Sequence, residues 1–440
     1  MILAEHRSPR LNYIAGWLGE RLFGSALKVV THEADCPSMM PLLNYSGRET
    51  RMTSFAIPPC GLLSENAIGE RDLQITGKAE EARFFPTGGD MGFDLFSAAF
   101  YLLSRYEEYL PHSLDEYGRF YYKDSIAWKG GFLKFPLLDI WLKNLKQQLL
   151  AFWPDLKFMP RDFTCQPSFD LDMAWAIRNK PHWVQTASLA KSFLTGRIRQ
   201  FNDRYSALLG FQQDEFDVFD DLIELHRSLE QDPIFFILAA ARKAGYDRNI
   251  SAENKEFIML QVQLSKQVKT GMHLSWAASR DVDLMHQEQE YFRTTLGEKA
   301  LRRNRMHYLN FSLPNTFRQL QALPVPVQQD FSMGYGNING FRASTSHPFY
   351  WYDLQKETIT SLELIPFCWM DANAIFEQKN SLAEAAAELQ FFHDTLKNCG
   401  GHLVTIGHNH MMGRDKAGRE WWKMYAEFYR KNFGANGTYS

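Results

Sequence analysis

Two carboxylates stand at the end of a strand-like segment, where residues 168–172 read Ser-Phe-Asp-Leu-Asp. Phe163 and Phe169 favour a half-buried strand, whereas aspartate is depleted in strand interiors. Asp170 and Asp172 are therefore expected at the carboxyl end of the strand, and a strand end that delivers two acids is typical of an active site. Taken alone, Asp172 could equally cap the helix that the following apolar residues indicate.

Other polar residues accompany apolar, strand-like runs later in the chain. They are His273 and Ser275, Arg305 and His307, Asp330, and His408 and His410. In a parallel barrel such positions converge on one face even when they are far apart in sequence. Carboxylates mixed with imidazoles suit Zn²⁺ or a similar divalent ion that keeps an open position for water. Each residue alone is weak evidence, because a lone strand histidine is more often a hydrogen-bonded core residue and Asp330 could open a turn.

The elements that must position these residues alternate between strand-like and helical patterns. The strand-like runs are 163–169, 234–238, 272–276, 307–311, 325–331, 362–367 and 402–406, and helical candidates include 252–266, 284–296, 381–396 and 419–433. This alternation predicts parallel strands with crossover helices, and closure into a barrel would bury both faces of the sheet. Seven strands are one fewer than in the standard eight-fold barrel.

The first third of the chain follows a different pattern. Helices are expected at residues 9–23, 93–109 and 137–152, with short strands between 27 and 75. Trp153-Pro154-Asp155 is the best domain boundary, because it follows an amphipathic helix and holds a helix-breaking proline. We therefore expect a small α/β or α+β domain over residues 1–155, of unknown role, and a barrel domain over residues 160–440.

Composition excludes some classes of function. The formal net charge of -3 gives no electrostatic reason to bind a polyanion, and the basic run at residues 191–204 is thin, so nucleic acid is not an expected partner. Five cysteines without paired spacing predict neither a disulfide framework nor a CxxC metal site. No uncharged run approaches the roughly 20 residues of a membrane span. Several of the first ten residues are charged, whereas a secretory signal needs an apolar core there. A cytoplasmic location is expected.

The motifs at the strand ends resemble those of the polysaccharide deacetylase-like proteins, relatives of carbohydrate esterase family 4. The resemblance rests on residues 168–172, 273–276, 305–309, 330–335, 340–342 and 408–409. It covers roughly residues 160–440 and implies an irregular seven-stranded (β/α) barrel, in agreement with the independent strand count. Residues 94–96 and 102–109 resemble the poorly characterised domain that precedes this barrel in some bacterial members, which transfers no chemistry.

In such deacetylases a metal held by one aspartate and two histidines activates a water, a first-strand aspartate acts as base, and a last-strand histidine acts as acid. Carried over, the resemblance implies that Asp170 is the base, that Asp172 and His273 are metal ligands, and that His408 is the acid. The metal would lower the pKa of water and polarise the acyl carbonyl. The implied ion is a divalent metal, Zn²⁺ above others, and the implied substrate is a bacterial carbohydrate that carries N-acetyl groups.

One position departs from the family pattern. The second motif usually carries two histidines four residues apart, but the residue four after His273 is Ala277. The candidate for the third ligand is His307, one strand further round, which the alternation of side chains places on the same face as Arg305. The runner-up is Glu288, which is otherwise expected to be a solvated charge on a helix.

The sequence allows more than one role for each of two arginines and more than one function for the protein. Arg305 or Arg342 could orient the base or bind substrate, and either could be a structural ion-pair residue. The leading function is a metal-dependent hydrolase that removes an acyl group from an amino sugar. The alternatives are a non-catalytic barrel that binds a glycan or a partner, and an amidohydrolase that acts on a non-sugar C–N bond, because fold alone does not separate these.

Overall fold

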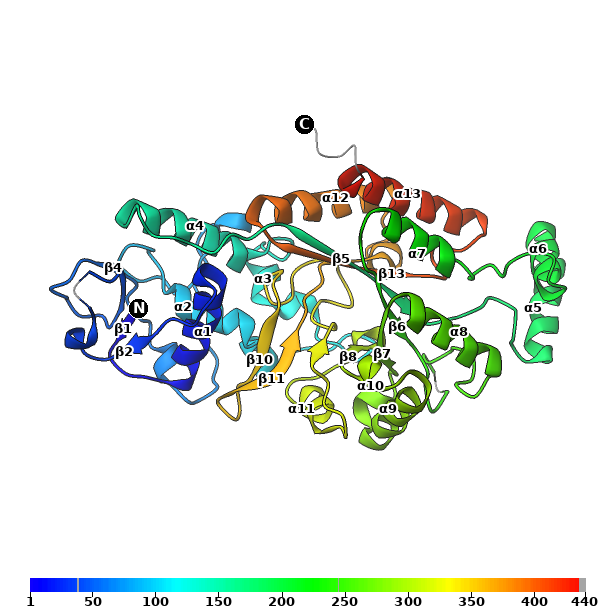
Figure 1. Ribbon diagram of the computed structural model, residues 1–440, viewed down its shortest axis with the longest axis horizontal. Coiled ribbons are helices and arrows are strands. Elements are labelled where there is room, and N and C mark those ends of the chain that lie inside the picture. The colour runs from blue at the N-terminus through cyan, green and yellow to red at the C-terminus, as the bar shows by residue number, and fades with distance from the viewer. Residues whose placement is uncertain (38, 244, 435–440) are drawn as a thin grey trace.

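The computed structural model describes residues 1–37, 39–243 and 245–434, and it is a mixed α/β protein with two sheets (Figure 1). The first sheet has four parallel strands in the order β2-β1-β3-β4. The elements of this part are β1 (Ile2–Ala4), α1 (Pro9–Phe23), β2 (Val29–Val30), β3 (Leu42–Tyr45), β4 (Ser54–Ala56), α2 (Leu95–Leu103), α3 (Ile126–Lys129) and α4 (Leu137–Phe152). The short strands expected between residues 27 and 75 are therefore present.

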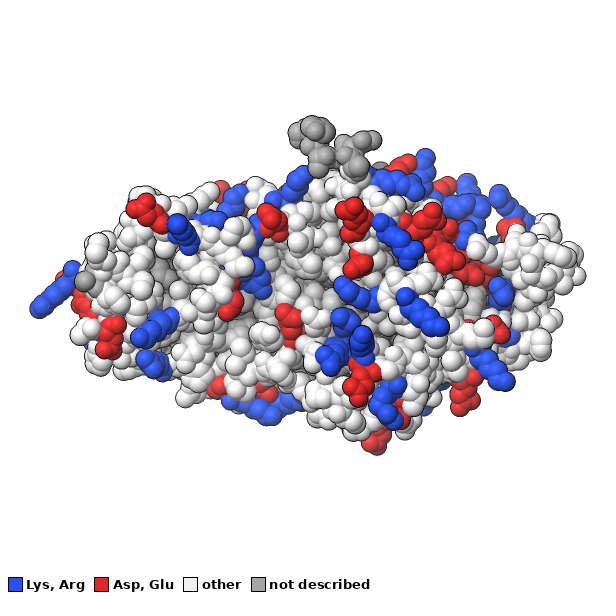
Figure 2. Space-filling model, viewed as in Figure 1, with Lys and Arg blue, Asp and Glu red and all other residues white. Residues whose placement is uncertain are grey.

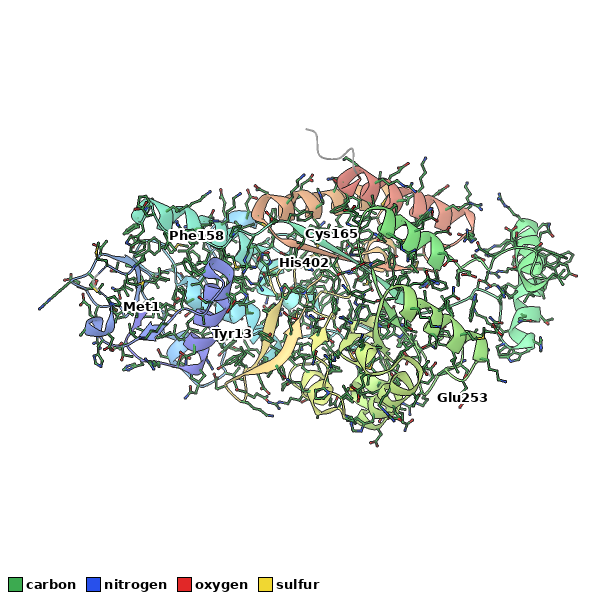
Figure 3. All side chains as sticks on the ribbon, viewed as in Figure 1. Met1, Tyr13, Phe158, Cys165, Glu253 and His402 are labelled. Carbon is green, nitrogen blue, oxygen red and sulfur yellow. The ribbon has the colours of Figure 1, made fainter. Side chains whose placement is uncertain are left out.

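Helix α1 shows how local sequence sets the ends of an element. Ser8 Oγ accepts a hydrogen bond from the backbone N–H of Leu11, and Gly24 ends the helix in the left-handed region at φ 73°. The apolar face predicted from the sequence is buried. Tyr13 lies on the side of α1 toward the second sheet and donates a hydrogen bond to the carbonyl of Tyr350 at 2.8 Å (Figure 3).

The second sheet holds nine strands in the order β10-β11-β9-β8-β7-β6-β5-β13-β12. They are β5 (Thr164–Leu171), β6 (Ile234–Ile237), β7 (Lys269–Leu274), β8 (Arg303–Met306), β9 (Gln329–Asp330), β10 (Phe349–Asp353), β11 (Thr358–Leu364), β12 (Trp369–Met370) and β13 (His402–His408). All neighbouring pairs are parallel except β10 with β11. The prediction of a parallel sheet with crossover helices is confirmed.

Helices connect and cover these strands. They are α5 (His182–Leu194), α6 (Ile198–Leu208), α7 (Phe219–Ser228), α8 (Lys255–Gln267), α9 (Val282–Leu296), α10 (Glu298–Leu301), α11 (Asn315–Ala322), α12 (Leu382–Cys399) and α13 (Lys416–Phe433). Short 3-10 turns lie at Glu33–Asp35, Leu62–Ser64, Ala79–Glu81, Tyr106–Tyr109, Tyr122–Asp124, Ala278–Arg280 and His307–Leu309, and a π turn at Asn373–Glu377. Figure 1 shows α12 and α13 along one side of the sheet, α8 to α11 on the other, and α5 with α6 standing off at one end.

Two details of the strand prediction need correction. Residues 307–311 are not a strand, because β8 ends at Met306 and the chain turns at once through Tyr308, whose φ is 57°. The sheet also contains more strands than the expected seven, since β10 and the two-residue β12 had no clear signal in the sequence. Closure into a barrel is not confirmed, because the pairing order runs in one line from β10 to β12 among the described residues.

The chain itself runs from β11, the strand next to one edge of this sheet, to β12 at the other edge. Residues 365–368 run from β11 to β12, and along the way Ile365 N donates to the carbonyl of Asp330 at 2.8 Å while Cys368 N donates to that of Val404 at 3.4 Å. The segment therefore bonds to both sides of the gap without forming a ladder.

The parts before and after residue 155 share one buried apolar core, whose residues run from Ile2 to Tyr429. A buried ion pair between Arg342 and Glu108 also spans them. The expected domain boundary at residue 155 stays a prediction. No helix in the described parts of the chain combines the length and apolar character needed to cross a membrane.

Candidate metal centre

Three side chains from the ends of β5, β7 and β8 converge on one point. Asp172 follows β5, His273 lies in β7 and His307 follows β8, and one ligand atom from each lies within 4.8 Å of the others. His273 Nε2 is 3.2 Å from Asp172 Oδ1, and His307 Nε2 is 3.6 Å from Asp172 Oδ2. These are the three residues that the sequence analysis put forward as ligands, and their role as ligands stays a prediction.

Each imidazole is oriented through its other ring nitrogen. His273 Nδ1 lies 2.8 Å from the carbonyl oxygen of Arg305, to which it donates, and His307 Nδ1 lies 2.7 Å from Asp247 Oδ1. Nδ1 of both rings is thereby engaged, which leaves Nε2 directed at Asp172 as a metal ligand would be. Fixed tautomers of this kind are typical of metal-binding histidines.

Asp247 holds His307 and is itself held by the backbone. Its carboxylate accepts hydrogen bonds from the backbone N–H groups of Trp276 at 2.8 Å and Ala277 at 3.1 Å while it binds His307. The backbone of residues 276–277 therefore supports Asp247, which in turn positions His307. The sequence analysis missed Asp247, which follows β6 after an irregular loop and ends no apolar run.

The donor set fits a divalent cation. Asp172 Oδ1 is buried and has no hydrogen-bond partner among the described residues, a costly state for a carboxylate oxygen unless a positive charge meets it. Burial acts to raise the pKa of Asp172, but His307, His273 and His408 together hold that pKa well below its usual range. One carboxylate and two imidazoles would leave a fourth position for water in a tetrahedral site.

Asp170 lies beside this cluster and is held by Arg305. The guanidinium Nη1 is 2.5 Å from Asp170 Oδ1, and Nη2 donates to Ser168 Oγ at 2.8 Å. Arg305 is fully buried, with its guanidinium carbon 4.3 Å from the centre of the Phe236 ring. The second oxygen, Oδ2, is 3.6 Å from His273 Nε2 and faces the cluster. Of the two candidate arginines, Arg305 is the one that binds the carboxylate of Asp170.

His408, at the end of β13, pairs in register with Asp170 of β5 and also faces the cluster. Its Nδ1 lies 2.6 Å from Asp371 Oδ1, its backbone N–H donates to Asp371 Oδ2 at 2.7 Å, and its Nε2 is 3.6 Å from Asp172 Oδ2. Burial acts to lower the pKa of His408, but the carboxylates of Asp371 and Asp172 outweigh it and raise the pKa to about 10. A protonated imidazole in this position can serve as an acid.

Sequence reasoning missed Asp371. It directly follows the two-residue strand β12, which is too short to give a periodic signal. A usable signal did exist, because Trp369-Met370-Asp371 repeats the pattern of an apolar run that stops at a carboxylate.

Four other candidates lie outside the cluster. Glu288, the runner-up ligand, is not a solvated charge: it is buried and accepts hydrogen bonds from the N–H groups of Ser275 and Ala241, and burial raises its pKa to about 7. Ser275 therefore binds Glu288 of α9 through its backbone N–H. Asp330 accepts from Asn304 Nδ2 at 2.7 Å, as a structural residue within the sheet.

The other two are Arg342 and His410. Arg342 binds Glu108 and does not reach Asp170. His410 lines the same cavity, with its ring centre 5.4 Å from that of His408, and its buried Nδ1 has no partner among the described residues. Burial lowers the pKa of His410 to about 4, so this imidazole is neutral at pH 7.

The cluster opens into a cavity of about 180 Å³. Part of its wall comes from the first third of the chain, through Tyr117 and Arg119. Arg119 is held there by Glu377 at 2.9 Å, and the Tyr117 ring centre lies 5.1 Å from that of Tyr308, which also lines the cavity. The early part of the chain thus completes the site, and no spacing or motif in the sequence indicated it. By contrast Trp351, Tyr352 and Trp369 are core residues.

Comparisons with known proteins are sparse. A family model described as a family of unknown function (DUF7033) matches residues 1–154. A search of curated proteins gave no match. One solved structure, titled "Crystal structure of putative polysaccharide deacetylase from Mycobacterium smegmatis", is 13% identical with a TM-score of 0.39, over 63% of this chain and 87% of that one. This is a distant likeness, and the interpretation of the site rests on its own geometry.

Proposed function

We propose that this protein is a metal-dependent hydrolase that removes an acyl group from the nitrogen of an amino sugar. One observation carries the proposal: Asp172, His273 and His307 present their ligand atoms to a common point within 4.8 Å, between a carboxylate held by Arg305 and an imidazole held by Asp371. A ligand set with a base and an acid beside it, on the paired strands β5 and β13, supplies the parts that amide hydrolysis requires.

The residues divide the proton transfers between them. Asp170 takes a proton from the attacking water, whose oxygen bonds to the acyl carbon. His408 then gives a proton to the nitrogen as the C–N bond breaks, so that a free carboxylic acid and an amine result. Asp172, His273 and His307 would hold a divalent cation, which lowers the pKa of a water and polarises the acyl carbonyl when bound.

Arg305 and Asp371 act through the residues that they hold. Arg305 binds one carboxylate oxygen of Asp170 and leaves the other oxygen to accept the proton of water. Asp371 accepts a hydrogen bond from Nδ1 of His408, so that Nε2, which gives its proton to the nitrogen, faces the cavity. Fixed geometry of this kind removes orientational freedom before the reaction starts.

An aromatic wall supports a carbohydrate as the substrate class. The rings of Tyr117, Tyr246, Trp276 and Tyr308 form a connected cluster with centre-to-centre distances of 5.0 to 5.3 Å, and Tyr117 and Tyr308 line the cavity. The half-buried aromatic faces offer apolar surface next to polar groups, which suits the faces of sugar rings.

Metal analysis of the purified chain tests the first half of the proposal. Near one equivalent of a divalent cation is expected, and His307→Ala should lower the occupancy roughly 10-fold or more. His410→Ala is the matched control, because it removes an imidazole of the same cavity from outside the ligand set. Unchanged metal content in a folded His307→Ala protein would sink the assignment and favour a barrel that binds a glycan without hydrolysing it.

Release of acetate from N-acetylglucosamine oligomers tests the second half. The metal-loaded protein should release acetate, and the chelated protein should not. A protein that binds the metal and leaves these oligomers intact, but hydrolyses simple N-acyl amides, would instead be an amidohydrolase of non-sugar C–N bonds.

A further inference from the structure

Helices α5 and α6 carry an unusual concentration of exposed apolar side chains. Of the twenty large hydrophobic residues that are exposed in the described chain, seven fall between residues 183 and 211. They are Trp183, Phe193, Leu194, Ile198, Tyr205, Leu209 and Phe211. Exposed apolar residues scattered singly need no explanation, but a cluster on one element marks an interaction site.

The pair of helices stands off from the body of the protein. Only Ser192 in α5 and Ala207 in α6 are buried. The two ends of this excursion are tied together by Asp214, whose buried carboxylate accepts hydrogen bonds from the N–H groups of Ala176 at 2.6 Å and Arg178 at 2.8 Å. Residues 178–213 therefore form a hairpin, the α5–α6 hairpin, that is fixed at its neck and projects beyond it (Figure 1).

The exposed residues form stripes along both helices. Trp183 and Leu194 are eleven positions apart, about three helical turns, so they point the same way and are 75% and 82% exposed. On α6, Ile198 and Tyr205 are seven positions apart, about two turns, and are 49% and 50% exposed. Helices of a soluble core bury such stripes, whereas these present them outward.

The same segment is strongly basic. Its cations are Arg178, Lys180, Lys191, Arg197, Arg199 and Arg204, and Asp203 is its single Asp or Glu. Arg199 lies about 100° from Ile198 around α6, and Arg197 directly precedes the helix, so both lie next to the start of the apolar stripe. The chain as a whole has a net charge of -3, so this positive charge is local.

Cations outnumber carboxylates behind the hairpin as well. A cavity of about 760 Å³ lies between the hairpin and the start of α13. Its walls hold six cations, Arg197, Arg199, Arg204, Arg414, Lys416 and Arg419, and three carboxylates, Asp203, Glu215 and Asp415. Figure 2 shows Lys and Arg side chains, together with a group of Asp and Glu side chains, at the inner border of the pale end of the molecule that α5 and α6 form.

We propose that the α5–α6 hairpin docks on an anionic lipid surface. Apolar stripes flanked by cations are the pattern of helices that lie in a membrane interface, where the apolar face enters the boundary of the acyl chains and the cations meet lipid phosphates. Each exposed cation near such a surface strengthens binding about fivefold, so Lys191, Arg197 and Arg199, which are exposed, act together with the aromatic and aliphatic side chains. A double-stranded nucleic acid would contact the cations through its phosphates and leave Trp183 and Leu194 without a partner.

Sedimentation with lipid vesicles tests the proposal on the full chain. The protein should sediment with vesicles of equal parts phosphatidylglycerol and phosphatidylcholine, and added salt should weaken binding. It should stay in solution with vesicles of phosphatidylcholine alone. Arg197→Gln with Arg199→Gln should weaken binding about 30-fold, and Trp183→Ser with Leu194→Ser at least about 10-fold.

Matched variants elsewhere serve as controls. Met259→Ser replaces a 62% exposed apolar side chain on α8, and Arg48→Gln with Arg51→Gln removes two exposed cations near the first sheet. Both should bind vesicles as the wild type does. The proposal is overturned if the wild type binds neither vesicle, or if the hairpin variants bind like the controls. A dimer in solution that the Trp183→Ser and Leu194→Ser changes dissociate, without vesicle binding, would make a second copy of the chain the occupant.

Discussion

The two buried arginines that the sequence could not separate, Arg305 and Arg342, occupy closely similar surroundings. Each is at most 1% exposed, each binds a buried carboxylate, and each guanidinium carbon lies over a phenylalanine ring, at 4.3 Å and 4.2 Å. They differ in what remains of the carboxylate. Asp170, the partner of Arg305, keeps Oδ2 toward the cavity.

Glu108, the partner of Arg342, has no oxygen to spare. Its Oε1 accepts from Arg105 at 2.7 Å and from Arg342 at 2.8 Å, and its Oε2 accepts from Arg342 at 2.6 Å. A buried carboxylate whose acceptor atoms are all engaged joins two parts of the chain, whereas one with a free oxygen beside a cavity can take a proton. The two pairs are alike in burial and charge. The free acceptor atom of Asp170 is what distinguishes the carboxylate proposed as a base from the structural carboxylate of Glu108.

Breaking the saturated pair should give the largest effect. Arg342→Met removes one partner of a buried ion pair and leaves Glu108 with excess negative charge away from water, so the free energy of unfolding should fall by about 3–5 kcal/mol. Urea unfolding measures this loss. Metal content and turnover per folded molecule should stay as in the wild type, because Arg342 does not touch the cluster.

Arg293→Met is the control for that change. Arg293 binds Glu290 through two hydrogen bonds of 2.7 and 2.6 Å, but both side chains are exposed, at 52% and 57%. Its loss should cost about 1 kcal/mol at most. Equal losses for the two variants would contradict the structural importance given to the Arg342 pair.

The saturated pair should also respond to acid. Burial acts to raise the pKa of Glu108, but Arg342 and Arg105 outweigh it and lower the pKa from 4.5 to about 2. A lowered folded-state pKa gives stability that is present above the unfolded value and lost as pH falls toward the folded one. The extra stability of the wild type over Glu108→Gln should therefore shrink by about 3 kcal/mol as pH falls from above 4.5 toward 2.

Unfolding free energies of both proteins at several pH values check this slope. Glu107, whose pKa burial raises, is present in both proteins, so the difference between them isolates Glu108. A difference that stays constant with pH would mean that the Glu108 carboxylate gains nothing from the two arginines.

The sequence predicted the site residues at the strand ends better than it predicted the residues that hold them in place. Asp170, Asp172, His273 and His408 stop or follow apolar runs, and in a parallel sheet that pattern alone brings them to one edge. His307 required a further step, the search for a replacement ligand on a neighbouring strand.

The residues that hold those side chains gave a weaker signal or none. Asp247 lies in an irregular loop and ends no apolar run, and Asp371 ends an apolar run whose strand has only two residues. Tyr117 and Arg119 reach the cavity from a part of the chain that is distant in sequence, and only the packing of the whole molecule brings them there. Glu288 on α9 was expected in solvent, because a single carboxylate on an amphipathic helix usually is. The sequence does not show that backbone N–H groups lie close enough to bind it.

Removing the free oxygen of the other pair should affect chemistry more than stability. Asp170→Asn keeps nearly the same volume but cannot accept the proton of water as a carboxylate does, so turnover should fall by about 10²-fold. Metal content should stay intact, because Asp172, His273 and His307 are unchanged. Acetate release and metal analysis on the same sample check both statements.

Glu108→Gln is the matched change at the structural pair, and it should alter stability with turnover per folded molecule preserved. Loss of metal from Asp170→Asn, with turnover falling in proportion, would reverse the roles of Asp170 and Asp172.

The smallest effect should come from replacing each arginine by lysine, which keeps the charge and loses the planar fork. Arg305 uses three donors, toward Asp170, Ser168 and the carbonyl of Phe331. A lysine that reaches Asp170 still offsets its charge but fixes the carboxylate less firmly, so turnover should fall only about 10-fold, or about 1.4 kcal/mol. Arg342→Lys should leave turnover unchanged and cost about 2 kcal/mol of stability, because one hydrogen bond to Glu108 is lost. If Arg305→Lys lowered stability and spared turnover, the orientation of Asp170 would not matter to the reaction and the contrast between the two arginines would fail.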